Sequence, residues 1–436
     1  MMMDQISVDR RSFIEENQEK IMQEYEYHRD RMFIQDQRKR NQQQPLYFDE
    51  YLGVYKHAVS KKRQSMKPLY SSPAVSTISL LSIHHDRPWP IPENVAQVHY
   101  LFKKARSIRD PSRQLSLCKT LMAIKTDNKE LHQTIQLETQ KLLKELSTGV
   151  LRVTEAQKLL ASCFGVGGLG LPCDRERAFL LYLQGSKQND PESNYRVGVC
   201  YELGIGTRRD YTRAVAFYRR AATLSHVAAM YKLSIILLKG YYQQVINVRE
   251  GIAQLQRAVS LATEKIPHPL HALALLIISN EFSDHLICDT GYALELLHQA
   301  AKLNYLPSQA KLGELYETGK LVQQVDEAKS IYWYSRAAEG GSAEAALALS
   351  CWYLTGSSNI LEQSDRQAYL WARKAASTAN IDRWTLAKAY YLVGIYIEKG
   401  IGTVEEEDPQ LWFQRSAILG HKGAMEKLKQ EEHSSH

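Results

Sequence analysis

The distribution of apolar positions divides the chain into two regions. Residues 1–92 are polar and show no sustained apolar period, and their Ser-rich and Pro-containing stretches favour an extended chain. From about Ala96 onward the pattern becomes helical and then periodic. We therefore expect a largely disordered N-terminal segment over 1–92, followed by an all-α body.

Pairs of small residues recur along the helical region at intervals of 36 to 42 residues. The pairs are Gly185-Ser186, Ala221-Ala222, Ala258-Val259, Ala300-Ala301, Ala337-Ala338, Ala375-Ala376 and Ser416-Ala417. Aromatic side chains such as Trp333 and Trp371 stand a few residues before a pair. Because helices that cross closely leave room for little more than a methyl group, each pair predicts a close helix–helix contact.

A second signal of the same period is a residue suited to end a helix. Glycine stands three residues after a large side chain at Gly167, Gly204, Gly240, Gly319, Gly356 and Gly400. In the fourth unit Asn280 takes this place. Asn is the common substitute for Gly in the left-handed conformation that ends a helix, so the exception supports the assignment.

Together these signals predict seven helix–turn–helix units of about 37 residues, none of which could bury its apolar face alone. The expected fold is a right-handed α-solenoid over 154–423. A helical cap or degenerate repeat should precede it over 93–153, with helices near Ser112–Ala123 and Glu130–Leu146. A capping helix and tail should close the chain over 424–436, with the helix at Ala424–Glu432.

The composition indicates which cellular compartment and which kinds of partner the chain is suited to. A formal charge of +7 and a pI near 8.9 are too mild for a dedicated nucleic-acid binder. We expect two basic clusters, Arg38-Lys39-Arg40 and Lys61-Lys62-Arg63, to be part of a solvated linker. The alternative is that they contact acidic lipid or act as a nuclear import signal. The six cysteines form no CxxC motif and have no common spacing, which favours free thiols in a reducing compartment.

The sequence favours a cytoplasmic protein that meets the membrane only through a partner. No apolar run approaches the roughly 20 residues that a bilayer requires. The first residues are charged where a signal peptide would be apolar, and the last residues, EEHSSH, offer no cysteine for prenylation.

The repeat unit resembles a known family. The stretch Ser308–Ala338, with SQAKLGELYETGK and IYWYSRAA, is similar to the Sel-one-like repeat, a relative of the tetratricopeptide. Four further stretches resemble the fungal chitin synthase regulatory factors: DPSRQL, YELGIGTRRD, AAKLNYLPSQAKLGELYETG, and ALSCWYLTGS followed by LEQSDRQAYLWARKAA. The resemblance implies a non-catalytic adaptor that binds and activates or localises membrane chitin synthase at the growing wall or division septum.

Motifs for chemistry give weak signals. Gly165–Gly170 reads GVGGLG, but a helix precedes it and Leu171-Pro172 follows, so an inter-helix turn is expected rather than a dinucleotide site. His84-His85-Asp86 lies in a stretch where histidines rarely converge on one metal ion. We therefore expect no catalytic residue, cofactor, metal or small-molecule substrate.

Partner contact is expected on the inner surface that the first helix of each unit would line in a tetratricopeptide-like stack. The residues expected to point inward are Tyr195, Tyr231, His271, Ala310, Leu347 and Tyr391, with Glu202, Leu238, Ile278, Glu317, Leu354 and Glu398. Tyr195, Glu202, Tyr231, His271, Glu317, Leu347, Tyr391 and Glu398 are the candidate partner-binding residues. Aromatic rings beside spaced glutamates suit a peptide or helix with apolar and basic side chains.

Three alternatives remain open at this point. The tyrosines could instead fill gaps between neighbouring repeats. The groove could serve another signalling or quality-control client as a generic Sel-one-like scaffold. A hydrolase hidden among the repeats would require a deep polar pocket with a coupled acid and base.

Overall fold

The computed structural model describes residues 46–49, 54–57, 88–108, 110–124, 126–148, 152–322, 324–358, 360–378, 382–402 and 407–434. Its contacts divide the chain into two units, Met1–Pro90 and Ile91–His436. The basic clusters at 38–40 and 61–63 and the histidine pair at 84–85 lie outside the described residues.

In the first unit two short strands form an antiparallel pair. Strand β1 (Leu46–Asp49) pairs with β2 (Val54–His57), and Leu46 lies opposite His57 in the register.

The second unit begins with three helices that precede the repeats. They are α2 (Val95–Ser107), α3 (Pro111–Met122) and α4 (Lys129–Thr148). Asp110 starts α3, because its side chain accepts the backbone N–H of Ser112 at 2.9 Å. Phe102, Leu117 and Leu121 from α2 and α3 are almost fully buried, so these helices share a core.

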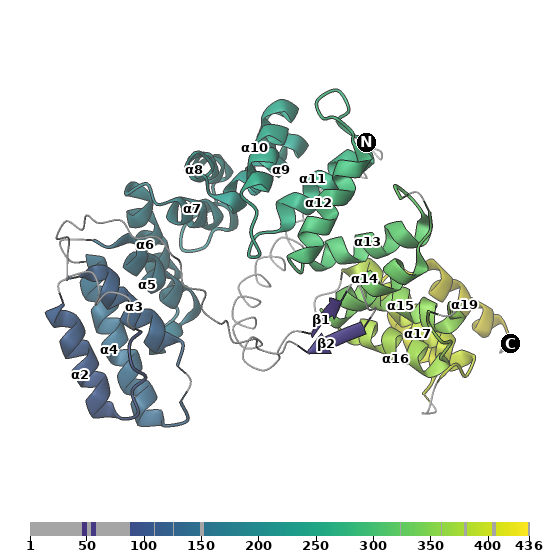
Figure 1. The fold of residues 1–436 in the computed structure, drawn as a ribbon, viewed down its shortest axis with the longest axis horizontal. Coiled ribbons are helices and arrows are strands. Elements are labelled where there is room, and N and C mark those ends of the chain that lie inside the picture. Colours follow the sequence, from purple (N-terminus) through teal and green to yellow (C-terminus); the bar gives the residue numbers. More distant parts are fainter. Residues whose placement is uncertain are drawn as a thin grey trace, which may run out of the picture. The chain divides into compact units, whose positions relative to one another are not determined.

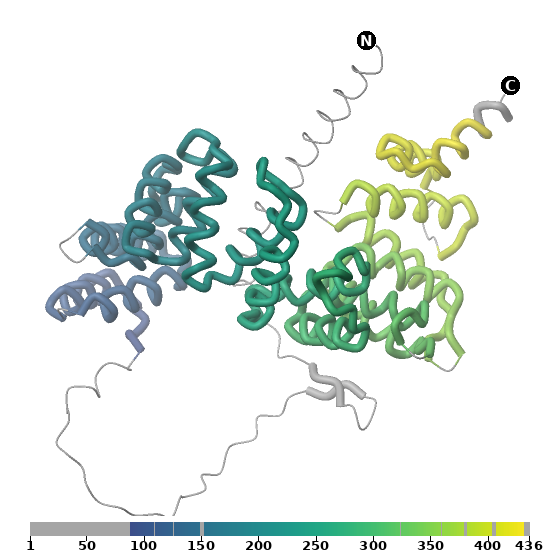
Figure 2. The backbone as a smooth tube through the Cα atoms, turned by 90° about the horizontal axis from the view of Figure 1, so that it is seen from above, coloured from purple at the N-terminus to yellow at the C-terminus, as the bar shows by residue number. Residues whose placement is uncertain are grey.

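Seven helix pairs follow, and consecutive pairs lie next to one another along the chain (Figure 1, Figure 2). We call the members of a pair the first helix and the second helix. The first helices are α5 (Thr154–Val166), α7 (Pro191–Leu203), α9 (Val227–Lys239), α11 (His268–Ser279), α13 (Leu306–Thr318), α15 (Ala343–Thr355) and α17 (Arg383–Glu398). The second helices are α6 (Arg175–Lys187), α8 (Tyr211–Thr223), α10 (Val248–Ser260), α12 (Thr290–Lys302), α14 (Glu327–Glu339), α16 (Asp365–Ser377) and α18 (Pro409–Ile418). Helix α19 (Lys422–Ser434) comes after the last pair.

Every second helix begins at a side chain that caps it. The capping residues are Asp174, Asp210, Asn247, Asp289, Asp326, Ser364 and Asp408. Each accepts a hydrogen bond from a backbone N–H two or three residues further on, which satisfies a donor that the helix itself leaves unpaired. The sequence therefore sets the start of each second helix locally.

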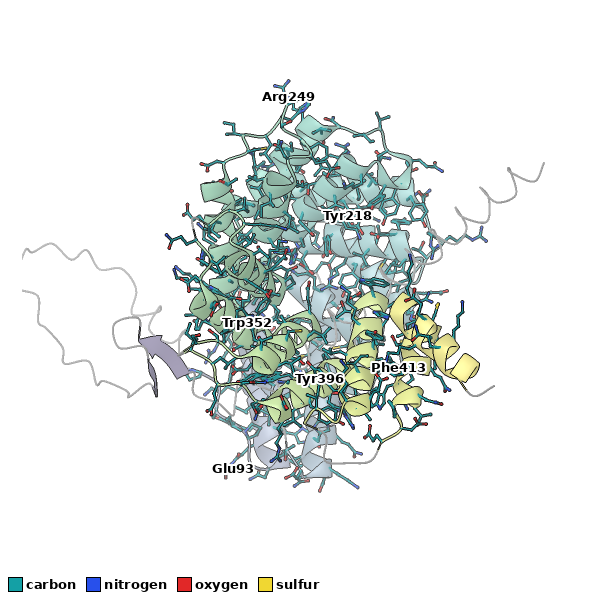
Figure 3. All side chains as sticks on the ribbon, turned by 90° about the vertical axis from the view of Figure 1, so that its right-hand side faces the viewer. Glu93, Tyr218, Arg249, Trp352, Tyr396 and Phe413 are labelled. Atoms are coloured by element: carbon teal, nitrogen blue, oxygen red, sulfur yellow. The ribbon has the colours of Figure 1, made fainter. Side chains whose placement is uncertain are left out.

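The small pairs lie where the sequence predicts close contact. The first residue of every pair is buried, and Ala221, Ala258, Ala300, Ala337 and Ala375 have no exposed surface at all. Tyr218 and Phe413 are among the largest fully buried side chains and lie within the helix layers (Figure 3). The prediction that small residues permit helix crossing and aromatic side chains fill the remaining space is confirmed.

The residues predicted to end the first helices have the left-handed backbone conformation. Gly167, Gly204 and Gly240 have φ between 70° and 73°, and Asn280 has φ 55° and ψ 20°. Gly356 differs, because its φ of 71° is combined with a ψ of 174°. There the chain leaves the helix in an extended direction, towards the isolated bridge between Ser357 and Leu361.

Within the described part of Ile91–His436 the regular elements are helices, accompanied by two isolated bridges. Short 3₁₀ segments, η1 (Gly168–Gly170) and η2 (Tyr241–Gln243), lie in the turns after α5 and α9. The glycine-rich stretch Gly165–Gly170 therefore ends α5 and forms the inter-helix turn after it, and the prediction of a turn is confirmed. The predicted fold class, an all-α array of helix–turn–helix repeats, is confirmed.

Candidate partner-binding surface

The aromatic residues of the predicted inner surface pack against the repeat that follows them. Four of them stack or meet edge-to-face with an aromatic ring near the start of the next first helix or, for Tyr391, near the start of α19. The ring pairs, with centroid distances, are Tyr195–His226 (4.8 Å), Tyr231–His268 (4.8 Å), His271–Tyr305 (5.3 Å) and Tyr391–His421 (4.3 Å). Tyr195 is buried and the other three are half-buried. These rings thus link consecutive repeats.

None of the rings that receive them was identified from the sequence. Three of them, His226, Tyr305 and His421, stand five residues after the first residue of a small pair. That spacing is a signal that could have identified them. His226 also starts α9: its Nδ1 accepts the N–H of Ala229 at 3.2 Å, so Nε2 carries the proton that it donates to Glu192 at 2.8 Å.

Glu192 is ionised by this arrangement. Burial alone would raise the pKa of its carboxyl. The hydrogen bond from His226 and the positive charge of Arg196, which also donates a hydrogen bond to the carboxylate at 2.7 Å, outweigh burial and hold the pKa well below its ordinary value. The pairing joins α7 to the start of α9 and strengthens the same inter-repeat contact that the Tyr195–His226 stack makes.

Glu202 lies in the core rather than on an open face. It is 3% exposed and accepts three hydrogen bonds. The donors are the hydroxyl of Tyr218, the Nζ of Lys232 at 2.8 Å and the hydroxyl of Tyr242 at 2.6 Å. Since these groups come from three repeat elements, Glu202 fixes α8, α9 and the turn after α9 relative to one another.

The two other candidate glutamates are more exposed but also have partners. Glu317 accepts the hydroxyl of Tyr334 at 2.7 Å. Burial, and next this hydrogen bond, raise the pKa of Tyr334. Glu398 pairs with Lys427 of α19 at 2.6 Å. Leu347 is half-buried against the apolar cluster around Leu349.

A further row of first-helix positions lies two residues after the Leu or Val of the repeat motif. These positions hold Ile235, Leu275, Glu314, Cys351 and Ile395, while Val199 at the same place is buried. Leu275 is 37% exposed and Cys351 is exposed. Glu314 pairs with Lys311 at 2.7 Å. We call Ile235, Leu275, Glu314 and Cys351 the first-helix stripe. The stripe lies on the same helix face as the predicted inner residues, four residues after the first set and three before the second.

The described residues contain little that indicates chemistry. No group of three His, Cys, Asp or Glu side chains among them could hold a metal ion. None of the six cysteines, all of which lie in the described part of the chain, forms a disulfide, and burial raises the pKa of Cys118 to about 12 and that of Cys163 to about 11. A hollow of about 300 Å³ between α3, α4 and α5 is lined mainly by apolar side chains, with His132 at its edge. Among the described helices none is both long and apolar enough to cross a bilayer.

The fold and its repeat contacts define an α-solenoid built from lengthened tetratricopeptide-like units. The chain belongs to the Sel1 repeat family. The matched segments are 154–190, 191–226, 227–261, 289–305, 306–342, 343–377 and 387–421. The segment between 261 and 289, where Asn280 replaces the usual glycine, falls outside the match.

Two curated fungal relatives are similar over most of the repeat region. Chitin synthase regulatory factor 3 of Schizosaccharomyces pombe is 38% identical over 286 residues, which is 65% of this chain and 30% of the relative. Chitin synthase regulator SKT5 of Saccharomyces cerevisiae is 34% identical over 296 residues, which is 67% of this chain and 41% of the relative. The chain therefore spans less than half the length of either relative.

Two solved structures share the fold. A protective antigen of uropathogenic Escherichia coli with an SLR fold superposes with a TM-score of 0.56 at 18% identity, covering 77% of this chain and 68% of the antigen. A Sel1 repeat protein from Oxalobacter formigenes gives a TM-score of 0.52 at 22% identity, covering 77% of this chain and 89% of that protein. At these identities the likeness supports the fold alone.

Proposed function

We propose that this chain is a non-catalytic regulator that binds membrane chitin synthase and activates or localises it. The observation that carries the proposal is the 38% and 34% identity to two proteins named as chitin synthase regulators. Together with membership in the Sel1 repeat family, this similarity indicates a non-catalytic regulatory protein. Repeat arrays of this kind act by presenting a long docking surface.

The first-helix stripe is the part of the array best suited to receive the enzyme. Leu275 and Cys351 offer accessible apolar surface, and Glu314 and Glu317 offer negative charge close by on α13. Such a surface suits a helix or extended segment that carries apolar and basic side chains. Binding would shift the enzyme towards an active conformation or hold it at a site, without chemistry by this chain. The proposed site of action is the plasma membrane at the septum or growth site.

The test uses fungal membranes that contain chitin synthase. The purified chain, added to these membranes, is expected to co-purify with the synthase and to raise its rate of chitin formation. The double variant Leu275→Glu/Glu314→Lys should lose both effects, because it changes an accessible apolar side chain and reverses a nearby charge. The matched control is Leu411→Glu/Glu339→Lys, which makes the same exchanges at exposed positions on α18 and α14.

Circular dichroism and urea unfolding of both double variants separate lost binding from lost folding. If the wild-type chain neither co-purifies with the synthase nor changes its rate, the proposal is wrong. If both double variants behave like the wild type, the enzyme binds elsewhere on the array. Capture of a different client in place of the synthase would favour the generic scaffold.

A further inference from the structure

Positive charge gathers at one end of the first three helix pairs. The relevant segments are the turns from first to second helix, with the start of the second helix: 166–177, 204–213 and 239–250. They contain seven basic residues, Arg175, Arg177, Arg208, Arg209, Arg213, Lys239 and Arg249, against four acidic ones, Asp174, Glu176, Asp210 and Glu250. Arg177 pairs with Asp174, Arg213 with Asp210, and Lys239 with Glu281 of the fourth turn. We call these three segments the basic edge.

Contacts between neighbouring segments make the basic edge continuous. A Cβ on Gly206 would lie 2.1 Å from the carbonyl oxygen of Arg175, so the second turn lies directly on the start of α6. Tyr242 in the third turn stacks on Tyr211 at the start of α8, with ring centroids 4.7 Å apart. The charges of the three segments therefore act on one surface.

The third turn also exposes apolar side chains. Val245 is 87% exposed, Ile246 is 59% exposed and Tyr241 is 42% exposed. Val166, at the first turn, is 64% exposed. Arg249 stands three residues after Ile246 and points away from the body of the molecule at the top of the view (Figure 3). Two adjacent aliphatic residues beside arginines at the tip of a turn form a projecting surface rather than a groove.

The structure holds this turn in an unusual conformation. Tyr242 and Gln243 have φ of 59° and 58°, in the left-handed region that residues with side chains seldom adopt. The hydroxyl of Tyr242 donates to buried Glu202 at 2.6 Å, and its ring is fixed by Tyr211. These contacts stabilise the turn in the form that projects Val245 and Ile246.

The corresponding turns further along the array have a different charge. The fourth, over 279–292, contains Glu281, Asp284 and Asp289 and no Lys or Arg. It also carries Ile287, which is 87% exposed. The fifth turn, where Val325 is 57% exposed, holds Lys320 and Lys329 against Asp326 and Glu327 and so has no net charge. Exposed aliphatic side chains thus occur in both places, but the excess of positive charge belongs to the first three segments taken together.

We propose that the basic edge binds a bilayer surface rich in anionic phospholipid. Val245 and Ile246 enter the headgroup region, and the flanking arginines contact lipid phosphates. A projecting aliphatic tip suits a deformable lipid surface, because a protein partner would have to supply a matching cavity. Arginines around the tip add electrostatic attraction that falls with salt, and Tyr241 is of the type enriched at the membrane–water boundary.

This inference goes beyond the proposed function, and its test contains no synthase. The full chain is mixed with vesicles of phosphatidylcholine alone, or with about one third phosphatidylserine, and bound protein is measured by flotation. Binding is expected to the phosphatidylserine vesicles only and to weaken as salt is raised. Absence of binding, or equal binding to both vesicles, would overturn the proposal.

Two variants place the contact on the basic edge. Arg208→Glu/Arg249→Glu should weaken binding to phosphatidylserine vesicles by about tenfold or more. The control Lys187→Glu/Lys302→Glu makes the same change of charge at two exposed lysines, which are the last residues of α6 and α12. Lys187 is therefore at the end of α6 that is away from the basic edge, and this control should bind like the wild type. If both double variants lose binding equally, the effect is one of net charge and the proposed site is wrong.

The apolar contact has its own pair of variants. Val245→Ser should weaken binding severalfold, whereas Ile418→Ser, at a residue that is 76% exposed at the end of α18, should leave it unchanged. Thermal unfolding of each variant checks that the fold is retained, since these side chains are exposed. If Val245→Ser and the wild type bind the vesicles equally, Val245 does not enter the headgroup region and that part of the proposal is wrong.

Discussion

Gly313 of α13 lies directly against the ring of Tyr334 in α14. A Cβ on Gly313 would lie 2.6 Å from Cδ1 of Tyr334, closer than any carbon–carbon contact allows. The same relationship occurs between Gly198 and Tyr218 and between Gly394 and Phe413, at 2.6 and 2.7 Å. In these repeats the glycine lets the aromatic ring of the second helix pack onto the backbone of the first helix.

Gly313→Ala should therefore destabilise the array although it replaces glycine by the best helix former. We expect a loss of about 1–3 kcal/mol from overpacking, measured as the free energy of unfolding in urea. The matched change is Gly165→Ala in α5, where a Cβ would meet nothing within 4 Å. That variant should be neutral or slightly more stable, because Ala is the better helix former. Equal effects at the two sites would contradict the packing argument.

Ala337 tests the small pairs. It has no exposed surface, so Ala337→Leu must displace neighbouring side chains and should cost about 1–3 kcal/mol of unfolding free energy. Ala328→Leu, at an exposed position of the same helix, adds the same side chain where there is room. It should change stability by less than about 0.5 kcal/mol. A tolerated leucine at Ala337 would mean that the helices separate easily there.

Asn280 tests the helix end of the fourth repeat. Its φ of 55° is in the left-handed region, where Gly has no steric cost and Ala does. Asn280→Gly should keep or slightly raise the melting temperature, and Asn280→Ala should lower stability by about 1 kcal/mol. If Asn280→Ala has a higher melting temperature than Asn280→Gly, the left-handed conformation at position 280 does not determine where this helix ends.

His271 makes the stability of the array depend on pH. Burial, and next the charge of Lys311, lower the pKa of His271 to about 4 from an ordinary value near 6.5. Above pH 6.5 the ring is neutral in both the folded and the unfolded chain. Between pH 6.5 and 4 the unfolded chain binds a proton that the folded chain does not, so stability falls as the pH is lowered, by about 3 kcal/mol at most.

The comparison is between His271→Gln and His285→Gln, the latter at an exposed residue of the fourth turn. Unfolding free energies are measured at pH 7 and at pH 4.5. His271→Gln should lose less stability between the two pH values than the wild type, and His285→Gln should lose the same amount as the wild type. If His271→Gln loses as much unfolding free energy between pH 7 and pH 4.5 as the wild type, the pH dependence comes from other groups.

The repeat architecture could be predicted because its signals are local. Caps such as Asp326 and helix ends such as Asn280 act through neighbouring backbone groups, and the small residue Ala337 recurs at a fixed interval. A periodic pattern therefore reveals the element, its ends and its closest contacts from the sequence alone.

The exposure of the first-helix side chains was harder to predict, because it depends on how closely the next repeat packs on them. Tyr195 and Glu202 lie on the same helix face as the first-helix stripe. They are buried because His226, Lys232 and Tyr242 of the next repeat cover them. The hydrogen bonds of Glu202 come from residues 16, 30 and 40 positions away, at a range that no periodic pattern specifies.

The ring stacks between consecutive first helices have a consequence for how the array responds to force and heat. At the fifth and sixth repeats the position of Tyr195 is held by Ala310 and Leu347, which cannot stack as a ring does. In a linear array, where each unit is coupled only to its neighbours, weaker coupling sets the place of first separation. Hydrogen exchange should therefore be faster in α15 than in α9, and a mechanical load should open the array around the sixth repeat before it opens the third.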